Sequence, residues 1–168
     1  MRKALDFLYD SAAALAALFM VGLLAMVLTS ILGRQLHFNV PGIDAYAGYM
    51  MAGAGFMALA HTLKKGEHIR VTLVLTALGA TPRRWLERWA MGAGAALAIL
   101  FAVYAVRLVL QSHEFNDMST SNDATPLWIP QLSMAVGAVV FAIAAIDELF
   151  FEWNGRAPAA DGEMLRHE

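Results

Sequence analysis

The chain has 168 residues, of which 59% are hydrophobic and only 15% are charged, whereas about a quarter of the residues of a typical soluble domain are charged. This balance favours a membrane protein, in which the formal net charge of −2 says less than the distribution of the charges. The absence of cysteine excludes disulfides, cysteine metal sites and thiol nucleophiles, and no basic face with interleaved aromatic residues supports nucleic-acid binding.

Four apolar segments are predicted to be transmembrane helices, at about residues 11–33, 45–63, 89–110 and 128–151. About 20 residues rising ~1.5 Å each cross a hydrocarbon core of about 30 Å. The first segment follows Arg2 and Lys3 but is longer than the roughly 7–15 residues of a signal-peptide core, so we interpret it as a retained span. The expected fold is an all-α membrane protein with one four-span domain at residues 1–152 and a cytoplasmic tail at 153–168.

The second loop contains a segment, residues 70–78, that is too short to span a bilayer but can lie along its surface. Its aliphatic residues fit one helical face, formed by Val71, Val74, Leu75 and Leu78. Beyond it, Trp85 and Trp89 are four residues apart and are typical of aromatic anchors at the headgroup level. We therefore predict an interfacial amphipathic helix in this cytoplasmic loop, with an ordinary basic loop as the alternative.

The distribution of basic residues predicts the orientation of the chain. One side of the predicted bundle holds ten of the 12 lysines and arginines, namely Arg2, Lys3, Lys64, Lys65, Arg70, Arg83, Arg84, Arg88, Arg156 and Arg166. The other side holds only Arg34 and Arg107. Because cytoplasmic loops carry the excess of basic residues, both termini and the second loop are predicted to be cytoplasmic.

Small residues recur every four positions in the third span, at Ala90, Gly94, Ala98 and Ala102. Such residues let helix backbones approach closely in a membrane. Gly94 and Ala98 are therefore candidate contact positions, either within the four-helix unit or against a partner subunit.

The histidines and the charges within the predicted spans give little support for a haem site or an ion pathway in this chain. Of the five histidines, only His61 lies in a predicted span, so the facing histidine pairs of a di-haem bundle are missing. No predicted span has a charge near its middle, where ionisable residues mark transport pathways. A self-sufficient homodimeric four-span transporter and a haem-binding electron carrier remain as alternatives.

Three motifs carry a resemblance to a known family: "NVPG" at 39–42 before the second span, "GEHIRV" at 66–71 after it, and "STSNDATPLWIP" at 119–130 leading into the fourth. Their order and spacing resemble the DctQ-like small membrane subunit of the tripartite ATP-independent periplasmic (TRAP) transporters. The sequence departs from that pattern at Asp44, which stands alone where family members often have an acidic pair, and at Thr72, which replaces an acid.

The resemblance implies a scaffold in the bacterial inner membrane that braces a large TRAP membrane subunit. A periplasmic binding protein would deliver an organic acid, taken up with an ion gradient, and the sodium sites would lie in the large subunit. We expect no catalytic, substrate-binding, metal or cofactor site in this chain. The candidate structural or partner-interface residues are Arg34, Asp44, Gly66, Glu67, His68, Arg70, Val74, Leu78, Trp85, Trp89, Gly94 and Ala98.

Overall fold

The computed structural model describes residues 2–65 and 80–153. Its helices are α1 (Arg2–Leu36), α2 (Ile43–Lys64), α4 (Ala80–Glu114) and α5 (Trp128–Trp153), and each covers one of the predicted apolar segments. The described part of the chain is helical, as expected, with one isolated β-bridge between Met118 and Pro126. The predicted interfacial helix at 70–78 and most of the tail lie outside the described residues.

Local backbone geometry ends α1 and α4 in the same way. The amide of Phe38 donates to the Gly33 carbonyl at 3.0 Å, and the amide of Asp117 donates to the Ser112 carbonyl at 3.0 Å. The residue before each donor is left-handed, His37 with φ 60 and Asn116 with φ 52. This is the Schellman arrangement, which satisfies carbonyls left free at a helix C-terminus.

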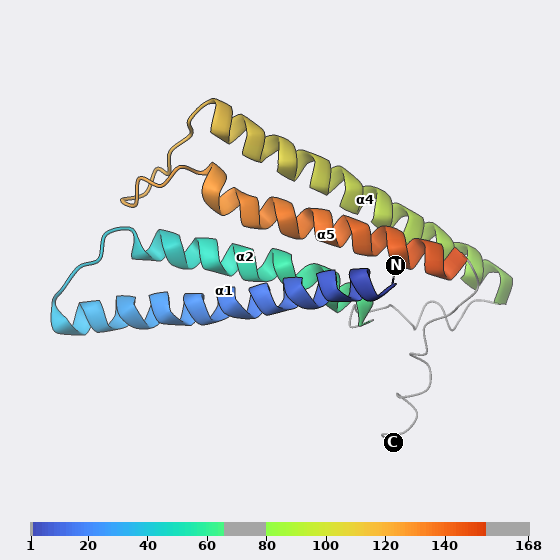
Figure 1. Ribbon diagram of the computed structural model, residues 1–168, viewed down its shortest axis with the longest axis horizontal. Helices are drawn as coiled ribbons and strands as arrows, with labels where there is room; N and C mark the ends of the chain where they lie inside the picture. Colours follow the sequence, from blue (N-terminus) through green and yellow to red (C-terminus); the bar gives the residue numbers. More distant parts are fainter. Residues whose placement is uncertain (1, 66–79, 154–168) are drawn as a thin grey trace, which may run out of the picture.

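The four helices run alternately up and down, so that the short loops 37–42 and 115–127 lie together at the end of the bundle opposite the N-terminus (Figure 1). We call this the loop end. α2 and α5 are the inner pair and pack against one another, while α1 packs mainly on α2 and α4 on α5. α1 and α4 are therefore the outer helices, each with a broad face that the described chain does not cover.

Three helices are long and apolar enough to cross a membrane by length and composition, over Leu5–Leu36, Arg88–Glu114 and Trp128–Phe150. α2 falls outside this group, although residues 45–63 were predicted to span. Its length is sufficient at 22 residues, but alanine, glycine and tyrosine replace the leucine and valine that make the other three helices strongly hydrophobic. The confirmed fold is therefore all-helical over the described residues, with three candidate spans among their helices.

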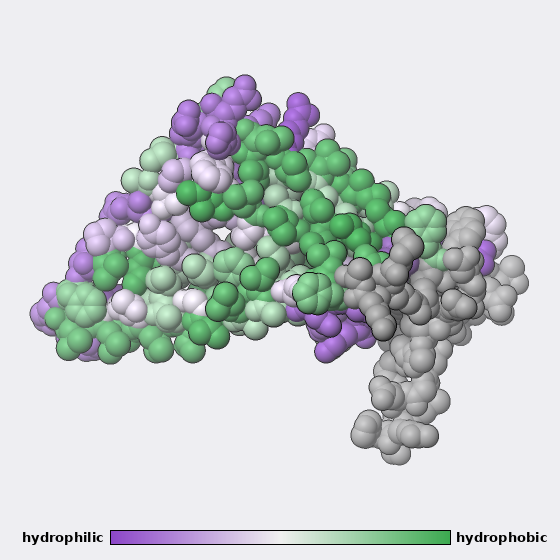
Figure 2. Space-filling view, viewed as in Figure 1, coloured by the Kyte–Doolittle hydropathy of each residue, from purple (hydrophilic) through white to green (hydrophobic). Residues whose placement is uncertain are grey.

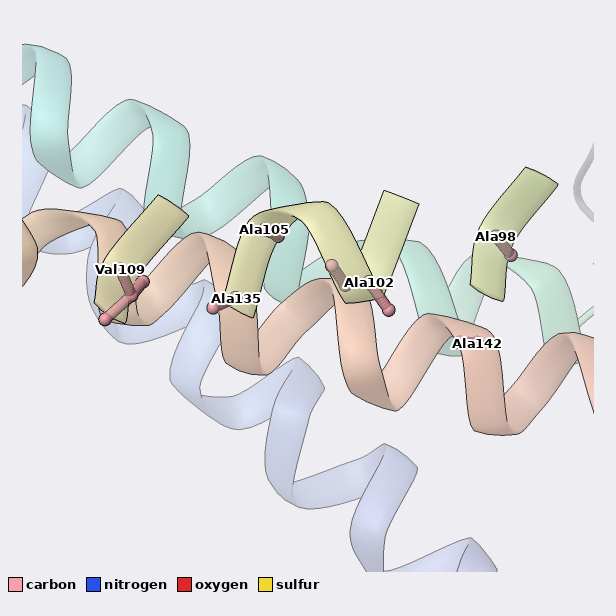
Figure 3. Close-up of a cluster of buried hydrophobic side chains, with 7 residues drawn as sticks. Ala98, Ala102, Ala105, Val109, Ala135 and Ala142 are labelled. Carbon is pink, nitrogen blue, oxygen red and sulfur yellow. The ribbon is translucent and has the colours of Figure 1, made fainter. Parts of the chain in front are cut away.

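The seam between α4 and α5 is built almost entirely of alanine (Figure 3). Its buried members are Ala98, Ala102, Ala105 and Val109 from α4 with Ala135, Ala138 and Ala142 from α5. The α4 positions alternate steps of four and three, the spacing that keeps side chains on one face of packed helices. Ala98 and Ala102 thus pack within the chain, whereas Gly94 is exposed and has no atoms near the place where a Cβ would lie.

A second buried cluster joins α1, α2 and α5 through Tyr9, Ala12, Ala60, Val140 and Ala144. Two glycines bring these helices close together. A Cβ at Gly137 of α5 would lie 2.6 Å from the carbonyl carbon and oxygen of Phe56 in α2. A Cβ at Gly53 of α2 would lie 3.1 Å from the ring of Phe19 in α1.

Candidate functional site

The two loops at the loop end meet in direct contact. Gly42, the last residue before α2, has φ 77 and ψ 2, a conformation that glycine adopts without steric cost. A Cβ at this position would lie 2.5 Å from the Cβ of Asp123 and 2.8 Å from its Cα. The "NVPG" and "STSNDATP" segments, far apart in the sequence, therefore pack backbone against backbone.

A hydrogen-bonded group, which we call the loop-end cluster, ties this contact to α2. It consists of Tyr46 and Tyr49 from α2 and Ser119, Asp123 and Thr125 from the second short loop. The Tyr49 hydroxyl donates to Oδ2 of Asp123 at 2.9 Å and lies 3.0 Å from the Ser119 hydroxyl, which donates to Oδ1 at 2.7 Å. The Thr125 and Tyr46 hydroxyls lie within hydrogen-bond distance of one another, at 3.2 Å.

The electrostatics of Asp123 follow from these donors. The Ser119 hydroxyl is the main cause that lowers the pKa of the Asp123 carboxyl from 3.8 to about 2, and the hydroxyls of Thr125 and Tyr49 act in the same direction. Partial desolvation opposes them. Hydrogen bonds to the ionised form of a carboxylate lower its pKa in this way, so Asp123 is an anion throughout the physiological range.

The backbone of the second short loop holds Asp123 in place. The Ser119 amide donates to the Thr125 carbonyl at 2.8 Å and the Leu127 amide to the Asp117 carbonyl at 2.9 Å. Between these bonds the chain turns tightly, and Ala124 takes a positive φ of 46. The loop is thus a small hairpin whose tip reaches the start of α2.

Beside the cluster lies an open hollow of about 630 Å³. Its walls come from the end of α1, the start of α2 and residues Ser121 and Asn122 of the second loop. Arg34, His37 and Asp44 line it, and the Ser30 hydroxyl donates to the Asp44 carboxylate at 3.3 Å. The hollow therefore brings cationic and anionic side chains together where the apolar part of α1 ends.

Charged residues also pair at the opposite end of the bundle, where the described chain begins. Lys64 of α2 forms an ion pair with Asp6 of α1, and its Nζ lies 5.0 Å from the centre of the Tyr9 ring. Nδ1 of His61 is 3.7 Å from the Asp10 carboxylate. These contacts tie the ends of α1 and α2 together, and they place His61 at a helix end.

The candidate residues from the sequence fall into separate groups. Arg34 and Asp44 meet in the hollow. Trp85 and Trp89 share the exposed start of α4, with 75% and 70% of each residue accessible. Farther along that helix Gly94 is exposed, whereas Ala98 is buried against α5. The rest are outside the described residues: Gly66, Glu67, His68, Arg70, Val74 and Leu78.

Sequence reasoning missed Tyr49, Ser119 and Asp123 as a connected group. Two tyrosines three residues apart at the start of α2 are a usable signal, because hydroxyls buried near a membrane need partners. The polar loop before α5 is the obvious source of those partners.

A comparison with protein families bears directly on these loops. The family model for the DctQ component of tripartite ATP-independent periplasmic transporters matches residues 23–155, which include most of the described structure. The chain belongs to the DctQ family. The match covers both short loops and the hollow between them, so the loop end is part of the DctQ framework. Comparison with individual curated proteins finds no match.

DctQ membership settles the broad class of this chain. It is a membrane component of a transporter and not an enzyme, which agrees with the apolar helices. Neither the loop-end cluster nor the hollow needs a catalytic interpretation. What the geometry offers is a fixed, hydrogen-bonded end to the bundle and two outer helices with uncovered apolar faces.

Proposed function

We propose that this DctQ-family chain is a scaffold that braces the large membrane subunit of a TRAP transporter. The observation that carries the proposal is the uncovered surface of the outer helices. In α4, Leu97 is 65% exposed and Leu110 is 64% exposed, and in α1, Leu18 and Val21 are exposed to the same degree. Figure 2 shows hydrophobic residues covering much of the visible face of the helices, with polar residues gathered toward the loop end.

The distribution of charge supports a structural role. The first predicted span, at 11–33, contains no charged residue, and neither do residues 45–60, 89–106 and 128–146 of the other three. Arg107, Asp147 and Glu148 lie in the end portions of the predicted spans at 89–110 and 128–151. Ionisable groups that handle substrates or ions in a membrane lie within the helices and face one another. Since the charges of this chain gather at helix ends, we assign the substrate and sodium sites to the large subunit.

All four helices cross the inner membrane in this proposal, with both termini and the second loop in the cytoplasm and the loop end in the periplasm. α2 is the one described helix without a segment apolar enough to be a candidate span. Because α1 and α5 pack on it from two sides, it needs less contact with lipid than the outer helices do. The excess of lysine and arginine on one side supports the orientation.

The remaining parts follow from the TRAP family. A periplasmic binding protein delivers an organic acid to the large subunit, and an ion gradient drives uptake. The present chain contributes no cofactor, and its role is to hold the stationary part of the large subunit in the bilayer.

Reconstitution tests whether transport resides in the large subunit and not in this chain. We expect the purified chain alone, in liposomes with an inward sodium gradient, to take up no organic acid above the empty-liposome background. The same chain reconstituted with the large subunit and the binding protein restores uptake. Uptake by the isolated chain would overturn the scaffold proposal and favour the self-sufficient transporter.

Cross-linking tests the contact itself, and the absence of cysteine makes the design simple. Single cysteines at Val21 of α1 and Leu97 of α4, labelled with a photoreactive maleimide, probe the two outer faces. Ala138, which is 0% exposed, is the buried control. We expect a cross-link to the large subunit from at least one outer face and none from Ala138, and the lack of any outer cross-link contradicts the proposal.

A further inference from the structure

The hollow at the loop end combines features that a scaffold role does not require. It lies where the apolar segment Leu5–Leu36 of α1 ends, which is the headgroup level if α1 crosses a bilayer. Its lining includes Phe38 and Val40, which are 45% and 40% exposed. Polar and apolar groups therefore share one opening, as an amphipathic ligand requires.

One side of the hollow suits an anion. Arg34 lines it and makes no ion pair within residues 2–65 and 80–153. The N-terminus of α2 adds to this, because Gly42 provides no side-chain cap. The Ile43 amide is engaged by the Val40 carbonyl and the Tyr46 amide by the Gly42 carbonyl, which leaves the amides between them available. Arg34 and the residues that carry these amides, Asp44 and Ala45, line the same hollow, and a guanidinium together with free helix amides is a favourable setting for a phosphate.

The other side suits a primary ammonium group. Oδ1 of Asp44 accepts one hydrogen bond from Ser30 at 3.3 Å, so its second oxygen remains open as an acceptor. Asn122 contributes a polar side chain from the second loop. The Asp44 carboxylate and Arg34 line the same hollow, and a ligand with opposite charges on adjacent groups matches both.

We propose that the hollow binds the headgroup of phosphatidylethanolamine. Arg34 and the free amides of Asp44 and Ala45 contact the phosphate, the Asp44 carboxylate accepts from the ammonium, and Phe38 and Val40 contact the start of the acyl chains. A free phosphate ion offers neither the ammonium nor the apolar part. The bound lipid would fill the space between the end of α1 and the second loop without contributing to transport chemistry.

Native mass spectrometry of the full-length chain, delipidated and returned to mixed micelles, tests this proposal. The micelles contain phosphatidylethanolamine, phosphatidylcholine or phosphatidylglycerol with matched acyl chains. We expect the chain to retain phosphatidylethanolamine most. Arg34→Gln should lower retention of all three lipids, by about tenfold for phosphatidylethanolamine, as the loss of one charge-assisted contact predicts. Asp44→Asn should remove the preference for phosphatidylethanolamine over phosphatidylcholine.

Arg107→Gln is the matched control, because Arg107 is an exposed arginine of α4 toward the same end of the bundle and does not line the hollow. Arg34→Lys keeps the charge and should recover much of the retention, and circular dichroism of each variant confirms its helices. Equal retention by Arg34→Gln and the parent chain overturns the proposal, as does an equal loss from Arg107→Gln. Displacement of the lipid by millimolar inorganic phosphate would show a site for free anions instead.

Discussion

Gly42 lies so close to the α-carbon of Asp123 that residue 42 has no room for a side chain. The contact has two requirements, a left-handed backbone at residue 42 and the absence of a Cβ there. Other residues of the chain adopt a left-handed backbone, but only glycine combines it with the absence of a Cβ. We therefore expect Gly42 to be the least replaceable residue of the loop end.

Gly42→Ala should destabilise the chain. A left-handed conformation costs a residue with a Cβ about 1–2 kcal/mol, and the overlap with the Asp123 backbone adds a cost typical of overpacking, about 1–3 kcal/mol. Thermal unfolding of the purified chain in detergent, followed by circular dichroism, measures the loss. Gly48→Ala is the control, because no atom lies within 4 Å of its Cβ position, and it should be neutral or stabilising by up to about 1 kcal/mol. An unchanged melting temperature for Gly42→Ala would contradict the described contact.

Asp123→Asn should remove the dependence on acidic pH of the stability that the loop end contributes. The pKa of Asp123 is about 2 in the folded chain and 3.8 without its partners, so the stability it contributes is fully present above about pH 4. That stability is lost as the pH falls toward 2. The difference in melting temperature between the parent chain and Asp123→Asn should shrink over this window. A constant difference from pH 6 to pH 2.5 would mean that the carboxylate is not hydrogen-bonded as described.

Gly137→Ala should separate the inner helices. Its methyl group would lie 2.6 Å from the backbone of Phe56, and a backbone cannot turn aside as a side chain does. We expect a loss of about 1–3 kcal/mol, visible as a lower midpoint of unfolding. Gly55→Ala, on the open face of α2, is the matched control. Equal effects of the two substitutions would argue against a close crossing of α2 and α5.

Reporter fusions test the proposed orientation. A phosphatase reporter placed after Asn122 should be active, because the proposed orientation puts this loop in the periplasm, and a fluorescent reporter that folds only in the cytoplasm should be active after Glu67. The same pair exchanged between the two sites should be silent. A cytoplasmic result at Asn122 is incompatible with the four-span arrangement.

The helices could be predicted because their signals are local. Continuous apolar runs indicated all four, and α5 begins at Trp128, the residue expected from the polar, proline-containing segment before it. The α4 stripe shows where such reasoning stops. Steps of four drift around a helix that turns every 3.6 residues, so Ala98 and Ala102 face α5 whereas Gly94 and Ala90 do not. Only the partner helix decides which positions continue the seam.

The loop end could not be predicted, because it depends on pairing between distant segments. The motifs around Gly42 and Asp123 were noticed for their resemblance to a family, and neither motif predicts that the two lie in contact. Arg34 and Asp44 were singled out separately, one as a lone basic residue and one as a lone acid. Their meeting in one hollow follows from the tight turn that His37 and Gly42 make between α1 and α2.

The alanine seam has a consequence for how the chain assembles in a bilayer. Alanine has no side-chain torsion to immobilise, so docking α4 on α5 sacrifices almost no rotamer entropy, whereas each leucine in such a seam would lose about 0.5–1 kcal/mol. Inside lipid there is little hydrophobic gain to offset that loss. A hairpin whose halves join through methyl groups can therefore close as soon as both halves are inserted, before any other subunit arrives.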